Sequence, residues 1–146
     1  MAYALAVVVL VVDRLTTSVA EGHLHGAVHV WGPFGFALQF NSGLAFSLFT
    51  GRATLVTVLL GLGVVVLAVL VARVRTTSQA IGGGLVLGGG LGNLSERVVS
   101  SHHGLVADFI TLSHWPTFNV ADACITTGVI VIAASLLLDH PVGAVR

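Results

Sequence analysis

Long apolar runs separated by short polar segments dominate this sequence. The clearest run covers residues 53–72, which are 20 positions without a charged side chain. A helix of about 20 residues crosses the hydrocarbon core of a bilayer. Comparable runs cover residues 2–20, 76–95 and 120–138. The pattern predicts an all-α integral membrane protein, with four transmembrane helices in one membrane domain that covers residues 1–146.

The first run differs from the others because Asp13 and Arg14 interrupt it. We expect a retained helix in which these two side chains pair near its outer end. A cleaved signal peptide is the alternative, since Ser18-Val19-Ala20 resembles a small-residue cleavage site. No positive charge precedes the apolar run, however, and the two charged residues would lie inside the region that must be hydrophobic, so the retained helix is favoured.

Glycine is concentrated in the third run. Gly84, Gly88 and Gly92 recur every four residues and therefore share one face of a helix. In a bilayer, such spacing lets a neighbouring helix approach closely. A flexible linker is a poorer interpretation because leucine and valine residues are interleaved with the glycines. We expect this face to pack against another helix.

The segments between the first two and the last two helices carry a different pattern. Residues 29–40 read HVWGPFGFALQF, in which large apolar side chains alternate with turn residues. This alternation predicts a small extramembrane β-sheet in the first outer loop, residues 21–52. Trp31 and Trp115 suit the membrane interface, where tryptophan is enriched.

Orientation follows from the arginines of the short turn between the second and third runs. Arg73 and Arg75 lie in this turn, and short positively charged loops remain cytoplasmic. With four crossings, both termini are predicted to be cytoplasmic. The segments 21–52 and 95–119 are then predicted to lie at the outer face.

Composition supports a membrane protein and excludes several other classes. Hydrophobic residues make up 55% of the chain, charged residues make up 8%, and the mean hydropathy is +1.01. This leaves too few charges to cover a soluble domain. All the basic residues are arginines and none forms a basic tract, so nucleic acid is not expected as a partner. The single cysteine, Cys124, lies in an apolar run and is expected to pack as a small hydrophobic side chain.

Asp108 and Asp122 are the candidate catalytic residues. Each lies beside an apolar segment, and no membrane crossing separates them, so they are expected at the same surface. An ionisable group at a membrane boundary is costly and therefore indicates function. Two carboxylates that share a proton can activate a water molecule and protonate a leaving group.

Four further polar residues, Asn41, Asn93, Arg97 and Asn119, map to the same outer level. Taken singly, each has an ordinary explanation: Asn119 is a good helix N-cap, and Arg97 could mark a helix end at the interface. Their convergence on one level is harder to explain by capping and predicts a shared site. The seven histidines lack a HExxH arrangement and are expected at the solvated surface, so neither a metal nor a cofactor is predicted.

Four strings of residues, taken together, resemble the sequence motifs of one family, the lipoprotein signal peptidases (signal peptidase II). Their order and spacing, with the four predicted helices, cover nearly the whole chain. They are Phe40-Asn41-Ser42-Gly43-Leu44-Ala45-Phe46, Gly88-Gly89-Gly90-Leu91-Gly92-Asn93-Leu94-Ser95-Glu96-Arg97, Val106-Ala107-Asp108-Phe109-Ile110 and Phe118-Asn119-Val120-Ala121-Asp122.

The resemblance implies an aspartyl endopeptidase of the bacterial inner membrane, with its active site at the outer face. Such enzymes cut lipid-modified prolipoproteins just before the cysteine that carries the diacylglyceryl group, and they are inhibited by globomycin-type cyclic peptides. Asp108 and Asp122 would be the catalytic pair. The motif positions that shape the site or hold substrate would be Asn41, Asn93, Arg97, Asn119 and Ala121.

The chain departs from the family pattern at two places. The family usually has aspartate at the position of Glu96, and it usually has an Asp-Gln-x-x-Lys-like string where this chain has Asp13 and Arg14. Because the carboxylate of Glu96 is not one of the catalytic pair, we expect this departure to preserve activity. In the other string the lysine is lost, and its charge would come from Arg14 on a different face of the helix. We assign Asp13, Arg14 and Glu96 structural roles.

Two rival interpretations remain. A small non-enzymatic transport or proton-relay protein would use the same carboxylates, but along a path through the bilayer. A structural helper protein without chemistry would use the asparagines only as caps, which gives no reason for the four ordered strings.

Overall fold

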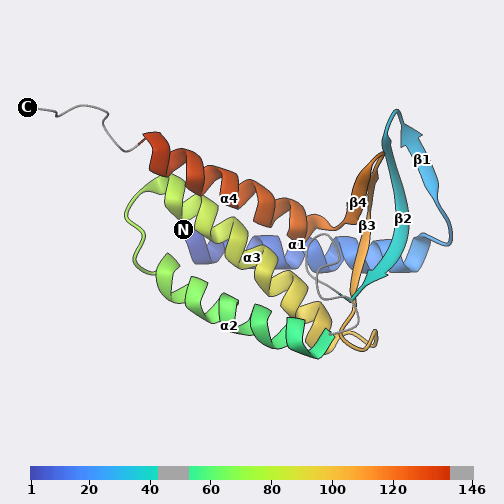
Figure 1. The fold of residues 1–146 in the computed structure, drawn as a ribbon, viewed down its shortest axis with the longest axis horizontal. Helices are drawn as coiled ribbons and strands as arrows, with labels where there is room; N and C mark the ends of the chain where they lie inside the picture. Colours follow the sequence, from blue (N-terminus) through green and yellow to red (C-terminus); the bar gives the residue numbers. More distant parts are fainter. Residues whose placement is uncertain (43–52, 139–146) are drawn as a thin grey trace, which may run out of the picture.

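The structure, a computed structural model, describes residues 1–42 and 53–138 and contains a helical bundle with a sheet at one end (Figure 1). The helix α3 lies at the centre, and α1, α2 and α4 surround and contact it. Gly43 to Phe46 of the first family string, as well as Arg52 and Asp139, lie outside the described residues. The helices are α1 (Ala2–His23), α2 (Ala53–Val71), α3 (Thr77–Val99) and α4 (Val120–Leu138).

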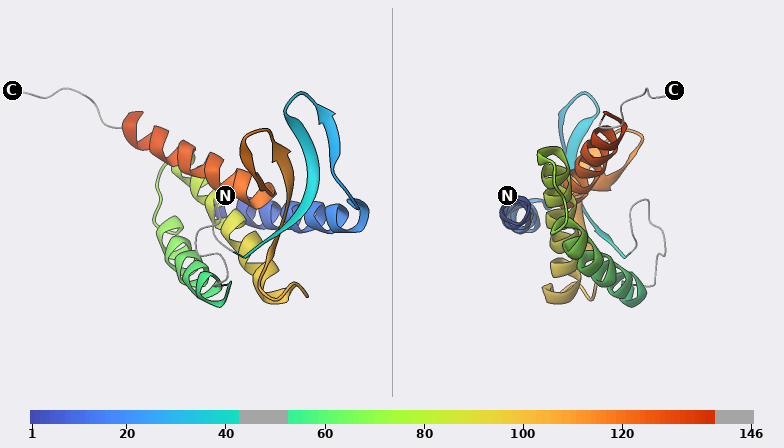
Figure 2. Two further views of the ribbon diagram at one scale, coloured as in Figure 1. Left: turned by 45° about the vertical axis from the view of Figure 1, so that its right-hand side comes forward. Right: turned by 90° about the vertical axis from the view of Figure 1, so that its left-hand side faces the viewer.

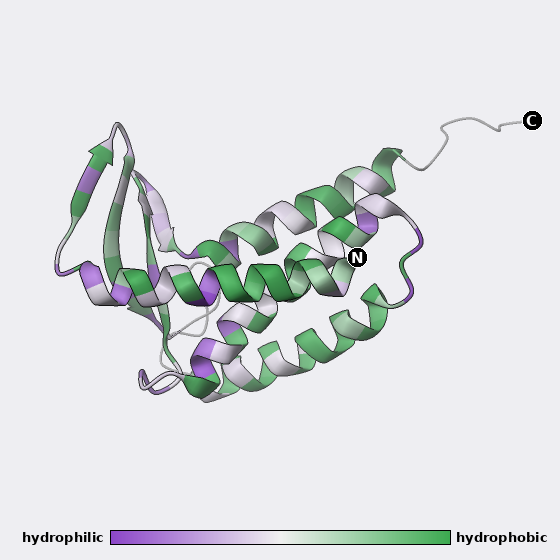
Figure 3. Cartoon of the chain, turned by 180° about the vertical axis from the view of Figure 1, so that it is seen from behind, coloured by the Kyte–Doolittle hydropathy of each residue, from purple (hydrophilic) through white to green (hydrophobic). Residues whose placement is uncertain are grey.

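All four helices coincide with the predicted runs, although α1 and α3 continue beyond the predicted ends at residues 20 and 95. Three of them, α1, α2 and α4, are long and apolar enough to cross a membrane. Most of the bundle is apolar, and hydrophilic segments lie near the sheet and in the turn between α2 and α3 (Figure 3). The helix α3 is not among these candidate membrane-spanning helices, because its glycine and polar residues lower its mean hydropathy.

The predicted glycine face of α3 packs against α1, as expected. A Cβ atom added at Gly84 would lie 2.7 Å from the carbonyl oxygen of Ala2, and one at Gly88 would lie 2.6 Å from the Cβ of Val9. A second glycine face, which the sequence reading missed, packs against α4: a Cβ at Gly82 would lie 2.8 Å from the carbonyl oxygen of Gly128. Glycine on two faces therefore lets α3 occupy the centre of the bundle.

The sheet contains four antiparallel strands in the order β1-β2-β3-β4. Strands β1 (Val28–Trp31) and β2 (Phe34–Asn41) come from the first predicted loop, and β3 (Val106–Leu112) and β4 (Trp115–Phe118) come from the segment between α3 and α4. The predicted small sheet is therefore present, and a second hairpin from the segment between α3 and α4 extends it beyond the first loop. The second hairpin joins because β3 pairs with β2 through a register that no local pattern encodes.

The left view in Figure 2 shows the sheet at one end of the bundle, beside the end of α1 and the start of α4. The start of α1, the end of α4 and the turn between α2 and α3 lie at the opposite end (Figure 1). Asp108 on β3 and Asp122 on the first turn of α4 are therefore at the same end of the molecule.

Candidate active site

Asp108 lies on β3, and the sheet register sets its neighbours. It is opposite Gln39 on β2, so Asn41, two residues further along β2, lies diagonally from it on the same face. The side-chain nitrogen Nδ2 of Asn41 donates a hydrogen bond of 3.1 Å to Oδ2 of Asp108. Asp108 is almost fully buried, with 2% of its surface exposed.

Asp122 lies in the first turn of α4, and Asn119 caps this helix. The Oδ1 atom of Asn119 accepts a hydrogen bond of 2.9 Å from the backbone N–H of Asp122, as the capping interpretation predicted. From α3, Nδ2 of Asn93 donates a hydrogen bond of 2.8 Å to Oδ1 of Asp122. An asparagine from another element therefore orients each carboxylate.

Asn119 also connects the two aspartates. Its Nδ2 donates to Oδ1 of Asp108 at 3.1 Å and to Oδ1 of Asn93 at 3.1 Å, while its own Oδ1 caps Asp122. Asn119 is completely buried, so these bonds form away from bulk water. The structure thus gathers the two aspartates and three asparagines that the sequence placed at one level.

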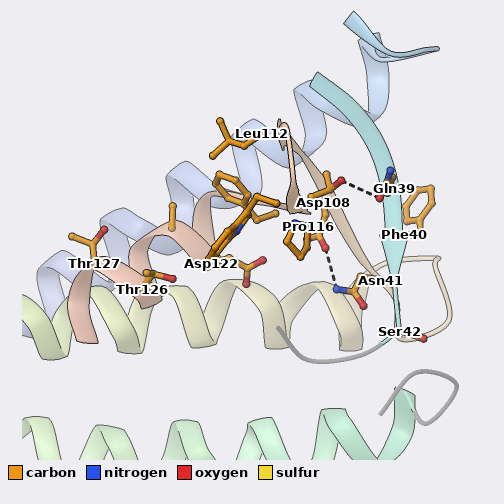
Figure 4. Close-up of a pocket in the computed structure, with 14 residues that line it drawn as sticks. Gln39, Phe40, Asn41, Ser42, Asp108, Leu112, Pro116, Asp122, Thr126 and Thr127 are labelled. Carbon is orange, nitrogen blue, oxygen red and sulfur yellow. Dashed lines mark hydrogen bonds between the residues drawn. The ribbon is translucent and has the colours of Figure 1, made fainter. Parts of the chain in front are cut away.

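Both aspartates line one cavity of about 480 Å³. Asp108, Asp122 and Asn41 point into the same space between α4 and β2 (Figure 4). Its walls include the aromatic residues Phe40, Trp115 and Phe118, and the hydroxyl residues Thr126 and Thr127 extend it along α4. The sequence reading missed these lining residues. The two threonines were the available signal, because they are polar residues inside an apolar run, about one turn beyond Asp122.

The electrostatic environment favours a proton on Asp108. Burial, and to a smaller extent the charge of Asp122, raise the pKa of this carboxyl from its ordinary value to about 7. The hydrogen bond from Asn41 and the charge of Arg97 act in the opposite direction on the same pKa. A carboxyl that holds a proton near neutral pH beside a second carboxyl can act as an acid while its neighbour acts as a base.

Arg97 lies in the last part of α3, near the aspartates. It is 8% exposed, and its Nη1 donates a hydrogen bond of 2.7 Å to the carbonyl oxygen of Gly104. Gly104 has a φ of +84°, a conformation that favours glycine. Arg97 therefore stabilises the turn that leads into β3 and also places a positive charge near Asp108.

Asp13 reaches the site from α1. Its Oδ1 accepts a hydrogen bond of 2.8 Å from the backbone N–H of Ala121, the residue before Asp122. Both Asp13 and Ala121 are fully buried. Gly92 makes room for this contact, because a Cβ there would lie 2.6 Å from Oδ2 of Asp13.

Glu96 makes the corresponding contact to β3. Its Oε1 accepts a hydrogen bond of 2.9 Å from the backbone N–H of Ala107, and its Oε2 lies 3.3 Å from Nη1 of Arg14. The expected pairing of Asp13 with Arg14 was therefore wrong. Successive side chains diverge by about 100° around a helix, so these neighbours face different partners.

Glu96 also belongs to a cluster with Glu21 and His102, whose potential ligand atoms lie within 4.8 Å of one another. His102 Nδ1 lies 3.6 Å from Oε1 of Glu21. The guanidinium group of Arg14 already places a positive charge against Glu96, which disfavours a bound cation there. The absence of a metal stays a prediction from sequence.

Comparison with known proteins identifies the family. The family model described as signal peptidase (SPase) II matches residues 5–138. The lipoprotein signal peptidase of Rhodococcus jostii (strain RHA1) is 38% identical, with 93% of this chain and 72% of the relative covered. That of Ectopseudomonas mendocina (strain ymp) is also 38% identical, with 90% and 85% covered.

Two solved structures, each described as a bacterial membrane enzyme, share the fold. One, determined at 2.3 Å, has a TM-score of 0.86 and 24% identity and covers 99% of this chain and 92% of its own. The other, at 1.9 Å, has a TM-score of 0.81 and 25% identity and covers 95% and 94%. Together with the extent of the family match and the identity to its members, this agreement leads to one conclusion: the chain belongs to the signal peptidase II family.

Proposed function

We propose that this protein is an aspartic endopeptidase that removes signal peptides from diacylglyceryl-modified prolipoproteins, cleaving just before the lipid-bearing cysteine. The observation that carries the proposal is the bridge by Asn119, which connects Asp108 and Asp122 at the edge of one cavity. The relatives named lipoprotein signal peptidase support the choice of substrate.

The proposed reaction uses the two aspartates and one water molecule, without a covalent intermediate or a cofactor. The ionised carboxylate removes a proton from water as its oxygen attacks the scissile carbonyl carbon. The protonated carboxyl donates a hydrogen bond to the carbonyl oxygen and then assists proton transfer to the leaving nitrogen. The raised pKa of Asp108 supports this division, because it keeps one proton on the pair near neutral pH.

The other site residues have supporting roles in this proposal. Asn41, Asn93 and Asn119 hold the carboxylates in orientation, and Ala121 presents the backbone before Asp122. Arg97 lowers the energy of the ionised dyad through its charge. The aromatic cavity walls would contact the apolar part of the signal peptide.

The proposal places the protein in the bacterial inner membrane, with four crossings and both termini in the cytoplasm. Although α3 is less apolar than the other helices, it contacts α1, α2 and α4, so much of its surface faces protein and not lipid. The arginines of the turn between α2 and α3 support a cytoplasmic position for that end. The dyad then lies at the outer face, where a lipid-anchored substrate can keep its acyl chains in the bilayer.

The test is cleavage of a diacylglyceryl-modified precursor by purified protein in liposomes. We expect cleavage by the wild type, inhibition by a globomycin-type cyclic peptide, and no cleavage by Asp108→Asn or Asp122→Asn. Both variants should remain folded, since asparagine is nearly isosteric with aspartate; thermal unfolding provides the control. Retained cleavage by either variant would remove that residue from the catalytic pair.

A further inference from the structure

A buried carboxylate outside the dyad holds the strand that carries Asp108. Glu96 is completely buried, and its Oε1 accepts the hydrogen bond from the N–H of Ala107 at 2.9 Å. Ala107 immediately precedes Asp108 and is itself fully buried. The strand β4 pairs with β3 only further along, at Ile110 and Leu112, so the side chain of Glu96 serves as the acceptor for this amide.

The other carboxylate oxygen of Glu96, Oε2, is paired with the guanidinium group of Arg14. Among the described residues, Oε2 has no hydrogen-bond partner, and Nη1 of Arg14 at 3.3 Å is the positive group that faces it. Removing one partner of a buried ion pair leaves an uncompensated buried charge, which is strongly unfavourable. The side chain of Arg14 is 37% exposed and that of Glu96 is 0% exposed. Water can therefore solvate the charge of Arg14 when the ion pair is lost, but it cannot solvate the charge of Glu96.

We infer that Arg14 is a positioning residue for Asp108: its guanidinium group holds the carboxylate of Glu96 in place, and Glu96 in turn fixes the backbone N–H that precedes Asp108. This inference rests on the proposed function, in which Asp108 is catalytic.

Other charged groups lie around Arg14 and Glu96, and they determine how removal of either charge would change the pKa of Asp108. From α1, Asp13 and Glu21 face Glu96, and His102 approaches from the segment after α3. Asp108 is influenced by Glu96, by Arg97 and by Asp122, and the negative charge of Glu96 raises its pKa. Neutralising Glu96 should therefore lower the pKa of Asp108.

The test compares Arg14→Gln, Glu96→Gln and the double variant with wild type, using the full chain in liposomes and a diacylglyceryl-modified precursor. Arg73→Gln is the matched control, because Arg73 is an exposed arginine in the turn at the opposite end of the bundle. Rates are expressed per folded protein, with folding measured by thermal unfolding. Hydrogen exchange at the amide of Ala107 reports on its bond to Glu96 without turnover.

We expect Arg14→Gln to lower kcat roughly tenfold or more with little change in KM, because small misplacement of a catalytic group is costly. The double variant should recover most of this loss, since glutamine at position 96 still offers an oxygen to Ala107 and leaves no isolated charge. Glu96→Gln should shift the alkaline limb of the pH profile to lower pH, because the charge of Glu96 raises the pKa of Asp108. A role in folding alone would produce neither the rescue nor the shift.

Normal kcat in Arg14→Gln, or a double variant no better than Arg14→Gln, would overturn the inference. If the wild type fails to cleave, the proposed function is wrong. Hydrogen exchange then still tests whether Arg14 and Glu96 together hold the amide of Ala107. Faster exchange at Ala107 in Arg14→Gln than in Arg73→Gln would support the coupling, and equal exchange would contradict it.

Discussion

The carboxylate of Asp13 on α1 holds the backbone N–H of Ala121 on α4 through a hydrogen bond of 2.8 Å. Glu96 on α3 makes the same kind of bond to Ala107 on β3. Each aspartate of the proposed pair therefore follows a fully buried alanine whose amide is bound by a carboxylate from another helix. Such bonds fix the backbone before each aspartate, and catalytic groups must be held to within about 0.5 Å.

Asp13→Ala should lower both stability and processing, because the buried N–H of Ala121 loses its acceptor. An unsatisfied buried donor costs about 1–3 kcal/mol. Asp13→Asn is the matched control, since its amide oxygen can still accept the bond, and it should have a smaller effect. Thermal unfolding and precursor cleavage are the measurements. Equal losses in the two variants would show that the charge of Asp13, and not its bond to Ala121, is what matters.

Gly92→Ala should disturb the same contact from the other side. The added methyl group would lie 2.6 Å from Oδ2 of Asp13 and 3.3 Å from the Cβ of Ala121, so α1 or α4 must move. Overpacking of this kind costs about 1–3 kcal/mol. Gly63→Ala on α2 is the control, because a Cβ there meets nothing within 4 Å. We expect a lower melting temperature and slower cleavage for Gly92→Ala only; similar behaviour of both variants would contradict the packing argument.

The helices could be predicted from sequence because each is a long run with few or no charges. The predicted start at residue 53 and end at 138 agree with α2 and α4, and the glycine spacing correctly indicated a packed face on α3. The ends of α1 and α3 were placed too early, because both helices continue into polar segments at the sheet end. Hydrophobicity marks the apolar part of a helix and not its last turn.

The second hairpin could not be found in the same way. Most of β3 is buried, so its residues lack the alternation of a half-exposed strand. Its pairing with β2, in which Asp108 lies opposite Gln39, joins segments far apart in the chain. A pattern search that examines neighbouring residues carries no information about such a register.

The candidate site was predictable as a set of residues but not as a network. Carboxylates and amides beside apolar runs indicated the site, and the cap by Asn119 followed from its position before Asp122. The partners of Asp13, Arg14 and Glu96 depend on how α1 lies against α3. Asp13 reaches Ala121 only because Gly92 lacks a side chain, a three-helix relationship that spacing cannot reveal.

Asn119 offers a test of the bridge, because one side chain both caps α4 and donates to Asp108. Asn119→Asp can still cap the N–H of Asp122 but loses the two donated bonds and adds a negative charge beside Asp108. Asn119→Ala loses the cap as well, and loss of a cap costs about 1 kcal/mol.

Both variants should therefore lose most processing, and Asn119→Ala should also unfold at a lower temperature than Asn119→Asp. Cleavage rate and thermal unfolding measured side by side separate the two roles. Wild-type cleavage by Asn119→Asp would mean that the donated bonds do not orient the dyad.

The pKa of Asp108 predicts how stability changes with pH. Its folded-state pKa is about 7, above the ordinary value of 3.8, mainly because of burial and then because of Asp122. The folded state thus keeps a proton that the unfolded state releases. The stabilisation by protonated Asp108 is fully present below about pH 4 and is lost as the pH rises through about 7.

Asp108→Asn removes this titration and leaves a neutral side chain of nearly the same shape. Its melting temperature relative to wild type should therefore rise between about pH 4 and about pH 7 and level off above that, because over this range the unfolded wild type releases a proton that the folded wild type keeps. Wild-type cleavage should fall over the upper part of the same range, since the dyad loses its shared proton. A melting-temperature difference that stays constant with pH would show that Asp108 is already ionised in the folded protein, and the proton required for the leaving nitrogen would then have to come from Asp122.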